Sequence, residues 1–224
     1  MLLLKIWWSL IATKNTDQDI DFEYLSKLHN FLQKYKDTSI ILVHWTGNVG
    51  HWFVKKFWLS QETKHQLRKD LDEYFQKIDK IFPEFQRISI EDVTNVKYHL
   101  SPKAKIICWG DITDEPKIIS SDDAFACFLH NEDIKESYLL TDVDGVLDKN
   151  GDIINQIDKK SFEDIHFWKK EWDVTGAMEQ KIKKLFNHKT WEEKKIWIIN
   201  GKKLDNFEKI ITKKEGIGTK IHIK

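Results

Sequence analysis

Lysines, aspartates and glycines stand in this sequence at the places where short apolar runs end. They lie in KIWWSLIATK at 5–14, HWTGNVGH at 44–51, SSDDA at 120–124, TDVDGV at 141–146 and DVTGAMEQK at 173–181. Lysines and main-chain amides at strand ends and helix starts bind phosphate groups and neutralise their charge. Each segment alone is a weak signal. Together they predict a site for a ligand that carries several phosphates.

The elements that position these segments are predicted by an alternation of buried apolar runs with longer amphipathic stretches. Strands are expected near 2–6, 39–44, 105–109, 137–141, 195–199 and 219–223. Helices are expected near 20–36, 48–57, 61–80, 122–131, 175–186 and 204–211, with a short one at 161–165. This pattern is typical of a three-layer α/β/α sandwich around a mainly parallel sheet. In such a sheet the loops at the carboxyl ends of the strands meet at one edge.

Two details of the pattern carry further expectations. The segment DKNGDII predicts a hairpin over about 146–154, with Asn150 and Gly151 where a left-handed backbone is needed. The helix expected at 61–80 has apolar residues at helical spacing amid charges, which is typical of a surface helix that packs one face on the core.

Composition limits the classes of function. The 224 residues suit a single domain over 1–224, and 36 basic residues balance 36 acidic ones. We therefore expect no nucleic-acid partner and no membrane partner, because no overall field attracts either. Cys108 and Cys127 lie in apolar runs, as small buried residues do. The apolar start of the chain lacks the features of a signal peptide, so a cytoplasmic protein is expected.

The order and content of the segments resemble the amino acid kinase superfamily, and within it the isopentenyl phosphate kinases. Those proteins carry K-x-G-G-S with a downstream lysine, H-G-G-G-x-x-G-H, G-D, I-S-G-D-D, T-D-V-D-G-V, D-V-T-G-G-M-x-x-K, N-G and a terminal G-T-x-I. This chain is similar to all eight in the same order, from Lys5 to its C-terminus. TDVDGV is unaltered, and DVTGAMEQK differs only by Ala177 for glycine.

The resemblance implies an ATP-dependent kinase and assigns roles residue by residue. The N-terminal part of the chain would supply the acceptor and phosphate loops, and the C-terminal part would supply the nucleotide site. Lys5 and Lys181 would contact the transferred phosphoryl group from opposite sides, and Asp122 would orient both lysines. The nucleotide site would be formed by Lys14, Ser9, Thr141, Asp142, Asn200 and Gly201. Mg²⁺ would arrive with ATP, and no direct protein ligand for the metal is named, although Asp142 and Asp144 also allow a metal-binding interpretation.

The acceptor site implied by the resemblance is the second segment, with Gly47, Gly50 and His51. His51 would act in catalysis by donating to the phosphate of a monophosphate acceptor, which an imidazole does readily near neutral pH. Without the surrounding motif His51 would be read as a solvent-facing residue at a helix start. The predicted reaction is phosphorylation of isopentenyl phosphate to the diphosphate, a step of isoprenoid biosynthesis. The alternatives are a kinase of another small phosphate or phosphonate, such as fosfomycin, and a non-catalytic protein on a kinase fold; a homodimer is left open.

Tryptophan is the departure from the family pattern. Trp7 and Trp8 replace both glycines of K-x-G-G-S, Trp45 replaces the first glycine of H-G-G-G, and Trp58 and Trp168 fall near other loop glycines. Glycine permits positive φ and lets main-chain N–H groups approach phosphate oxygens without an intervening Cβ. Indoles at these positions would instead fill the space for the ATP phosphates.

Three explanations are open: degeneration into a binding protein, chance, and a gene in which UGA encodes glycine but was translated as tryptophan. We favour the third, because lysines, aspartates and threonines of the motifs persist while glycines turn into tryptophan. The sequence has 9 glycines and 10 tryptophans, whereas average usage would give roughly 16 glycines. Ala177 and Ser121 also replace family glycines and need a different origin.

Overall fold

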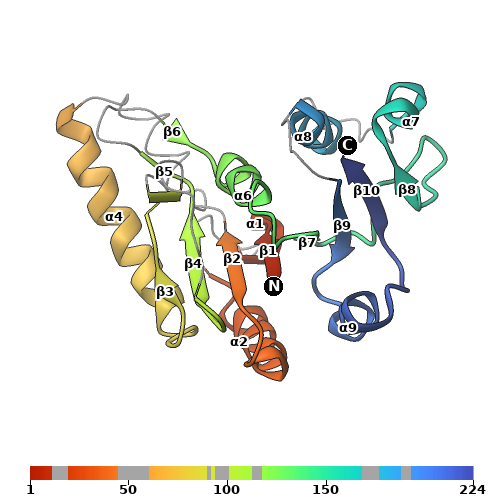
Figure 1. Cartoon of the computed structure of the whole chain (residues 1–224). Coiled ribbons are helices and arrows are strands. Elements are labelled where there is room, and N and C mark those ends of the chain that lie inside the picture. Colours follow the sequence, from red (N-terminus) through yellow and green to blue (C-terminus); the bar gives the residue numbers. More distant parts are fainter. Residues whose placement is uncertain are drawn as a thin grey trace.

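The strands of this chain form one large sheet with helices on both faces (Figure 1). The computed structural model describes residues 1–11, 20–44, 61–89, 92–93, 101–112, 118–167, 177–187 and 193–223. The eight strands of the sheet, in chain order, are β1 (Leu2–Ile6), β2 (Ile40–His44), β3 (Gln86–Arg87), β4 (Lys105–Trp109), β7 (Glu136–Thr141), β8 (Gln156–Ile157), β9 (Lys194–Asn200) and β10 (Thr219–Ile223). Their spatial order is β3-β4-β2-β1-β7-β9-β10-β8.

The pairing is parallel from β3 across to β9, and only β9 and β10 run antiparallel to each other. β1 lies in the centre, with Lys5 opposite Val43 of β2 on one side and Leu139 of β7 on the other. A second, two-stranded sheet pairs β5 (Asp111–Ile112) with β6 (Ile118–Ile119). The predicted mainly parallel sheet is confirmed.

Helices cover the two faces of the sheet. They are α1 (Trp8–Ile11), α2 (Phe22–Leu32) with the 3-10 turn η1 (Gln33–Tyr35), α4 (Gln61–Asp79), α6 (Ser121–Leu129), α7 (Lys159–Asp164), α8 (Ala177–Asn187) and α9 (Leu204–Lys213). Buried residues of α1, α2, α4 and α9 pack on one face, and those of α6 and α8 pack on the other. In Figure 1, α6 and α8 lie toward the top and α2 and α9 toward the bottom.

The alternation of side chains along β1 decides what each face receives. Leu2, Leu4 and Ile6 enter the layer beneath α2, whereas Leu3 enters the layer beneath α6 and α8. Lys5 has the parity of Leu3, so it points to the α6 and α8 face. A lysine with only 2% of its surface exposed is therefore placed in an apolar layer, where a counter-charge is required.

The six predicted strands are all present, and the predicted helices agree within a few residues wherever the chain is described. The helix expected at 48–57 lies outside the described residues. The sequence did not indicate β3, β5, β6, β8 or α1, because elements of two to four residues show no periodicity. The hairpin is confirmed by an antiparallel bridge between Leu147 and Ile153. Gly151 has φ 88°, but Asn150 does not have positive φ, so its expected left-handed backbone is wrong.

In the described part of the chain, no helix combines the length and the apolar composition needed to cross a bilayer.

Candidate active site

Lys5 and Asp122 form an ion pair at the centre of the sheet. The Lys5 ammonium donates to Asp122 Oδ1, and the two residues come from β1 and from the first turn of α6. Burial lowers the pKa of Lys5 to about 8, although Asp122 opposes that shift. Burial alone would raise the pKa of Asp122, but Lys5, Lys181 and Lys184 together hold it below its ordinary value. The pair therefore joins a buried ammonium to a half-buried carboxylate, with additional positive charge beside it.

The first turn of α6 is fixed by a capping box, which explains why Asp122 faces Lys5. The Ser120 hydroxyl accepts from the Asp123 main-chain N–H at 3.2 Å, and Asp123 Oδ2 accepts from the Ser120 main-chain N–H at 3.1 Å. Gly110, just after β4, lies so close that an added Cβ would sit 2.7 Å from the Ser121 nitrogen. The glycine of the G-D motif thus lets the start of α6 approach the sheet.

Lys181 reaches the same region from α8. It lines a cavity together with Asp122, Trp7 and Lys184, and burial, partly opposed by Asp122, lowers its pKa. Two lysines from different elements therefore lie near one half-buried carboxylate, which is the grouping that the family resemblance implies. Such an arrangement can neutralise the charge of a phosphoryl group in transfer.

Trp7 lies across this arrangement. The Lys181 ammonium is 3.5 Å from the centroid of the Trp7 ring, a cation–π contact. The space left in the cavity is about 10 Å³, room for one water molecule. With an indole at position 7, no phosphoryl group fits between Lys181 and Asp122.

The backbone of residues 7 and 8 sharpens what glycine would contribute. Among the described residues, the only ones other than glycine with positive φ are Lys103 and Lys214, so neither Trp7 nor Trp8 adopts a left-handed backbone. The Trp7 main-chain N–H donates to the Leu140 carbonyl at 3.0 Å and continues the ladder between β1 and β7. Of the two expected reasons for glycine, positive φ therefore does not apply here, and the amide of residue 7 is not available to phosphate. Space for the ligand is the reason that remains.

The residues predicted for the nucleotide lie at the ends of the neighbouring strands β7 and β9. Thr141 pairs with Asn200, and the Gly201 main-chain N–H donates to the Thr141 carbonyl at 2.8 Å. The Asn200 amide donates to the Asp142 carbonyl at 3.4 Å and to Asp144 Oδ1 at 3.0 Å. The structure thus brings these four predicted residues together at the carboxyl edge of the sheet.

Ser9, in α1, belongs to the same edge. Its hydroxyl oxygen is buried and has no hydrogen-bond partner among the described residues. A buried hydroxyl without a partner is costly and fits a position that a polar ligand completes. Four other predicted site residues, Lys14, Gly47, Gly50 and His51, lie outside the described residues, as do Trp45, Trp58 and Trp168.

Lys184 and Lys203 are site residues that the sequence interpretation missed. Lys184 Nζ lies 2.6 Å from Asp123 Oδ1, and Lys203 Nζ lies 2.7 Å from Asp144 Oδ2. The spacing of Lys181 and Lys184, three residues apart on a helix, was the available signal, because such residues share one face. Asp144 was read as a metal candidate, and in the structure its carboxylate is engaged by Lys203 and Asn200. The described residues contain no group of three or more potential metal ligands.

Comparison with known proteins gives the decisive observation. A sequence profile described as the amino acid kinase family matches residues 66–200, more than half of the chain. The chain belongs to the amino acid kinase family. This confirms the family, the fold and the class of enzyme that the motifs predict.

The similar proteins include isopentenyl phosphate kinases and a synthase. The isopentenyl phosphate kinase of Methanocaldococcus jannaschii is 28% identical, over 94% of this chain and 95% of its own length. The crystal structure of a T. acidophilum isopentenyl phosphate kinase product complex superimposes with a TM-score of 0.69 at 20% identity, covering 99% of both chains. N-acetylglutamate synthase from Neisseria gonorrhoeae also shares the fold, with a TM-score of 0.63 at 12% identity, over 61% of that longer chain.

Proposed function

We propose that this member of the amino acid kinase family transfers the γ-phosphoryl group of ATP to isopentenyl phosphate. An oxygen of the acceptor phosphate attacks the γ-phosphorus, the bond from that phosphorus to the β,γ-bridging oxygen breaks, and ADP leaves with the bond's electrons. Mg²⁺, arriving with ATP, would supply further positive charge to neutralise the phosphates. The chain's own contribution is to position the two phosphate groups and to neutralise their charge.

The observation that carries the proposal is the approach of a buried lysine, Lys5, and a half-buried one, Lys181, to one carboxylate. Lys5 comes from a central strand and Lys181 from a helix on the same face of the sheet. The charge of Asp122 opposes the lowering of the pKa of both lysines. In the proposed reaction the lysines stabilise the charge that shifts to the leaving oxygen, and Asp122 keeps both ammonium groups in place. Thr141, Asp142, Asn200, Gly201 and Ser9 line the nucleotide site, and Lys14 reaches the ATP phosphates.

The acceptor assignment rests on the curated relative and on the second motif. The Methanocaldococcus jannaschii relative is an isopentenyl phosphate kinase, and this chain has Gly47, Gly50 and His51 at the matching positions of the motif. His51 donates a hydrogen bond to the acceptor phosphate in this proposal. His51→Ala is expected to raise the KM for isopentenyl phosphate at least tenfold while the KM for ATP stays within threefold. An unchanged acceptor KM would remove the isoprenoid assignment and favour another phosphate or a phosphonate.

The working protein, in the same proposal, carries glycine at positions 7, 8 and 45. The support is steric: the Trp7 ring covers Lys181 and leaves room for a single water beside Asp122. A gene in which UGA encodes glycine accounts for this, since it changes glycines alone. TGG codons at these positions would exclude that origin.

One experiment separates this proposal from a second candidate, a non-catalytic protein whose site is closed by Trp7. The chain as printed and its Trp7→Gly/Trp8→Gly/Trp45→Gly form are each incubated with ATP, Mg²⁺ and isopentenyl phosphate, with fosfomycin and other small phosphates as competing acceptors. We expect ADP and isopentenyl diphosphate from the glycine form only, and ³¹P NMR detects both products. The mass of the protein purified from its own host then tells which form exists. Indoles at 7, 8 and 45 in a protein that turns over ATP contradict the proposed mechanism.

A further inference from the structure

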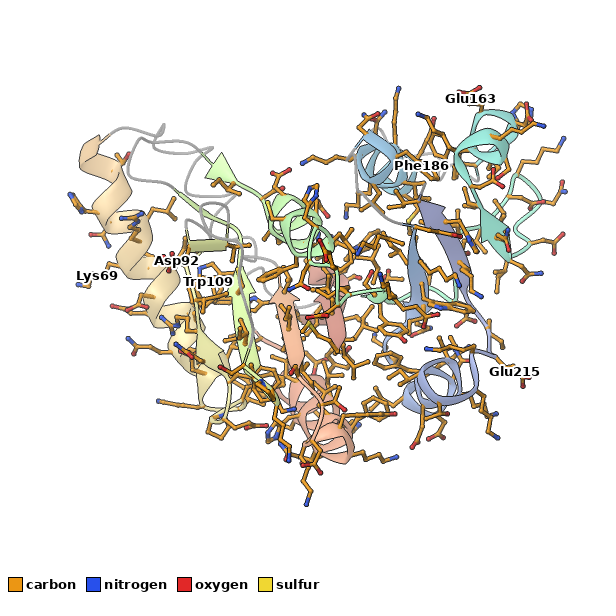
Figure 2. All side chains as sticks on the ribbon, viewed as in Figure 1. Lys69, Asp92, Trp109, Glu163, Phe186 and Glu215 are labelled. Carbon is orange, nitrogen blue, oxygen red and sulfur yellow. The ribbon has the colours of Figure 1, made fainter. Side chains whose placement is uncertain are left out.

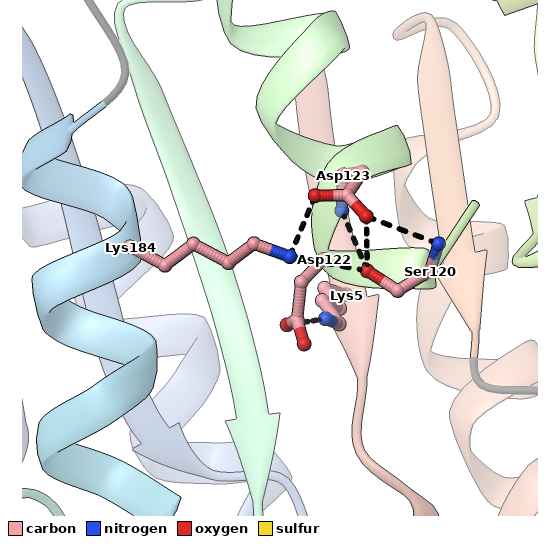
Figure 3. Close-up of polar contacts among 5 residues, drawn as sticks. All are labelled: Lys5, Ser120, Asp122, Asp123 and Lys184. Carbon is pink, nitrogen blue, oxygen red and sulfur yellow. Dashed lines mark hydrogen bonds and ion pairs between the residues drawn. The ribbon is translucent and has the colours of Figure 1, made fainter. Parts of the chain in front are cut away.

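A second ion pair lies beside the Lys5–Asp122 pair and joins two helices. Lys184 of α8 contacts Asp123 of α6, with 2.6 Å between Nζ and Oδ1 (Figure 3). Lys184 is three residues after Lys181, and Asp123 is the neighbour of Asp122. Each partner of this pair is thus close in sequence to a residue of the proposed catalytic set.

Asp123 is a rigid anchor because its two carboxylate oxygens have separate partners. Oδ2 accepts from the Ser120 hydroxyl at 2.6 Å and from the Ser120 main-chain N–H at 3.1 Å, which caps α6. Oδ1 faces α8 and receives Lys184. The pKa of Asp123, which burial would raise, is held below its ordinary value by Lys184 and Ser120. The carboxylate is therefore ionised, and its bonds to Ser120 orient Oδ1 toward Lys184.

The contact between α6 and α8 needs such a tie. Ile182 and Leu185 pack α8 on the sheet, which fixes the helix against the strands. Between the two helices, however, Lys181, Lys184 and Leu185 line the small cavity that also borders Asp122. The cavity leaves room for about one water molecule beside the apolar contacts, so a polar tie between the helices adds to what sets the separation of α8 from α6.

We propose that Lys184 and Asp123 form a positioning pair, which holds α8 against the start of α6 so that Lys181 faces Lys5 and Asp122 across the transferred phosphoryl group. The inference rests on the proposed phosphoryl transfer. In this role Lys184 acts through its contact with Asp123. Residues three apart share one helix face, so the anchoring of Lys184 limits rotation of α8 and the position of the Lys181 ammonium.

The test replaces each partner in the full chain with glycine at positions 7, 8 and 45. Lys184→Met removes the charge and keeps the length, whereas Asp123→Asn keeps an oxygen for Ser120 and weakens the tie to Lys184. Misplacement of a catalytic group by a fraction of an ångström to an ångström costs roughly 10- to 100-fold in rate. We expect kcat to fall by that factor in either variant and no further in the double variant, with the KM for ATP within threefold. Lys184→Arg, which still reaches the carboxylate, is expected to retain kcat within threefold.

A matched control lies on the opposite face of the sheet. Lys34 and Glu208 are 2.7 Å apart, with 54% and 37% of their side chains exposed, compared with 47% and 34% for Lys184 and Asp123. Lys34→Met therefore removes an ion pair of similar length and exposure that also joins two elements. It is expected to leave kcat unchanged. A drop in kcat as large as that of Lys184→Met would show a general loss of stability and would overturn the positioning role.

A second readout does not depend on turnover. Hydrogen exchange of the peptide covering residues 177–187 is expected to speed up in Lys184→Met and in Asp123→Asn, but not in Lys34→Met. Unchanged exchange in both variants overturns the inference, whether or not the parent protein has kinase activity. If the parent is inactive but exchange does speed up, only the proposed function fails. Faster exchange without a change in kcat in an active parent also overturns the inference, since α8 would then be loosened with no effect on Lys181.

Discussion

Two pairs of tryptophans occupy different surroundings in this molecule. Trp109 at the end of β4 is 8% exposed and stacks on Phe75 of α4, with ring centroids 4.0 Å apart, and it lies on the α4 side of the sheet (Figure 2). Trp197 in β9 is 5% exposed and lies under the Lys220 ammonium. Trp8, in contrast, is 48% exposed, and Trp7 is only half-buried at the edge where the lysines converge.

The difference separates tryptophans that fill the apolar core from tryptophans that lie at the edge of the proposed site. Trp109 and Trp197 fill the apolar layer on one face of the sheet, and their removal would leave cavities. Trp7 covers a lysine that the proposed chemistry needs, and Trp8 faces solvent over about half of its surface. The indole nitrogens do not discriminate between the pairs. Those of Trp7 and Trp197 are both buried, and neither has a hydrogen-bond partner among the described residues.

The largest expected effect tests this separation directly. Trp109→Gly and Trp197→Gly should each lower the free energy of unfolding by about 3–5 kcal/mol, because each deletes a buried aromatic side chain. Trp7→Gly/Trp8→Gly should lower it by at most about 2 kcal/mol, the loss of partly exposed apolar area and one cation–π contact. Urea unfolding of the three proteins provides the measurement. Equal losses would mean that Trp7 and Trp8 are structural residues after all.

The second prediction concerns the lysine beneath Trp7. In the glycine form, Lys181→Ala should lower kcat by roughly 100- to 1000-fold, about 2.7–4 kcal/mol, because its contact strengthens as charge develops on the phosphoryl group. The KM for ATP should change by less than fivefold. Steady-state kinetics with ATP and isopentenyl phosphate check this. A loss confined to KM would assign Lys181 to ground-state binding. It would not show what the space covered by the Trp7 ring does in catalysis.

The larger part of this arrangement was predictable from the sequence. Continuous apolar runs such as IILVH indicate strands buried on both faces, and their order predicts an edge where Lys5, Asp122 and Thr141 gather. The role of Asp122 beside Lys5 was instead implied by the resemblance, through the match of the SSDD segment to the I-S-G-D-D motif. The strand predictions succeed because hydrophobic patterning acts locally and strongly.

Other features had no local signal. The pairing of Lys184 with Asp123 joins residues 61 positions apart, which neither periodicity nor propensity reports. The amide of residue 7 was expected to face phosphate, yet it binds the Leu140 carbonyl, because sheet register and not residue type decides that bond. The antiparallel direction of β10 likewise depends on the loop between residues 214 and 218 and on packing against β9. Long-range pairing therefore limits what the sequence alone predicts.

The third prediction uses the burial of Lys5, which shares its face with the Trp7 edge. Burial lowers its folded pKa to about 8 from 10.5, so between these values the unfolded chain binds more protons. Stability attributable to Lys5 therefore rises with pH over that range, by about 2 kcal/mol from pH 7 to 9.5. Urea unfolding of the printed chain and of Lys5→Met at both pH values gives the difference, in which other titrating groups cancel. In the glycine form kcat/KM should fall over the same pH range, since the reaction needs the Lys5 ammonium. If the stability of the printed chain and that of Lys5→Met depend on pH in the same way, the lowered pKa of Lys5 is contradicted.

The smallest effect tests whether the segment after β1 is one packed unit. Leu10 of α1 is fully buried, and an added Cβ on Gly201 would lie 2.5 Å from its Cδ1 and 2.7 Å from the Tyr24 hydroxyl. Gly201→Ala should therefore lower the free energy of unfolding by about 1–2 kcal/mol.

Combining Gly201→Ala with Trp8→Gly asks whether Trp8 shares that packing. If Trp8 is independent of the contact between Leu10 and Gly201, the two losses should add within about 0.5 kcal/mol. Urea unfolding of both single variants and the double variant measures this coupling. A coupling above that value would show that the exposed indole supports Leu10, and Trp8 would then belong with Trp109 and Trp197 among the tryptophans that the fold uses.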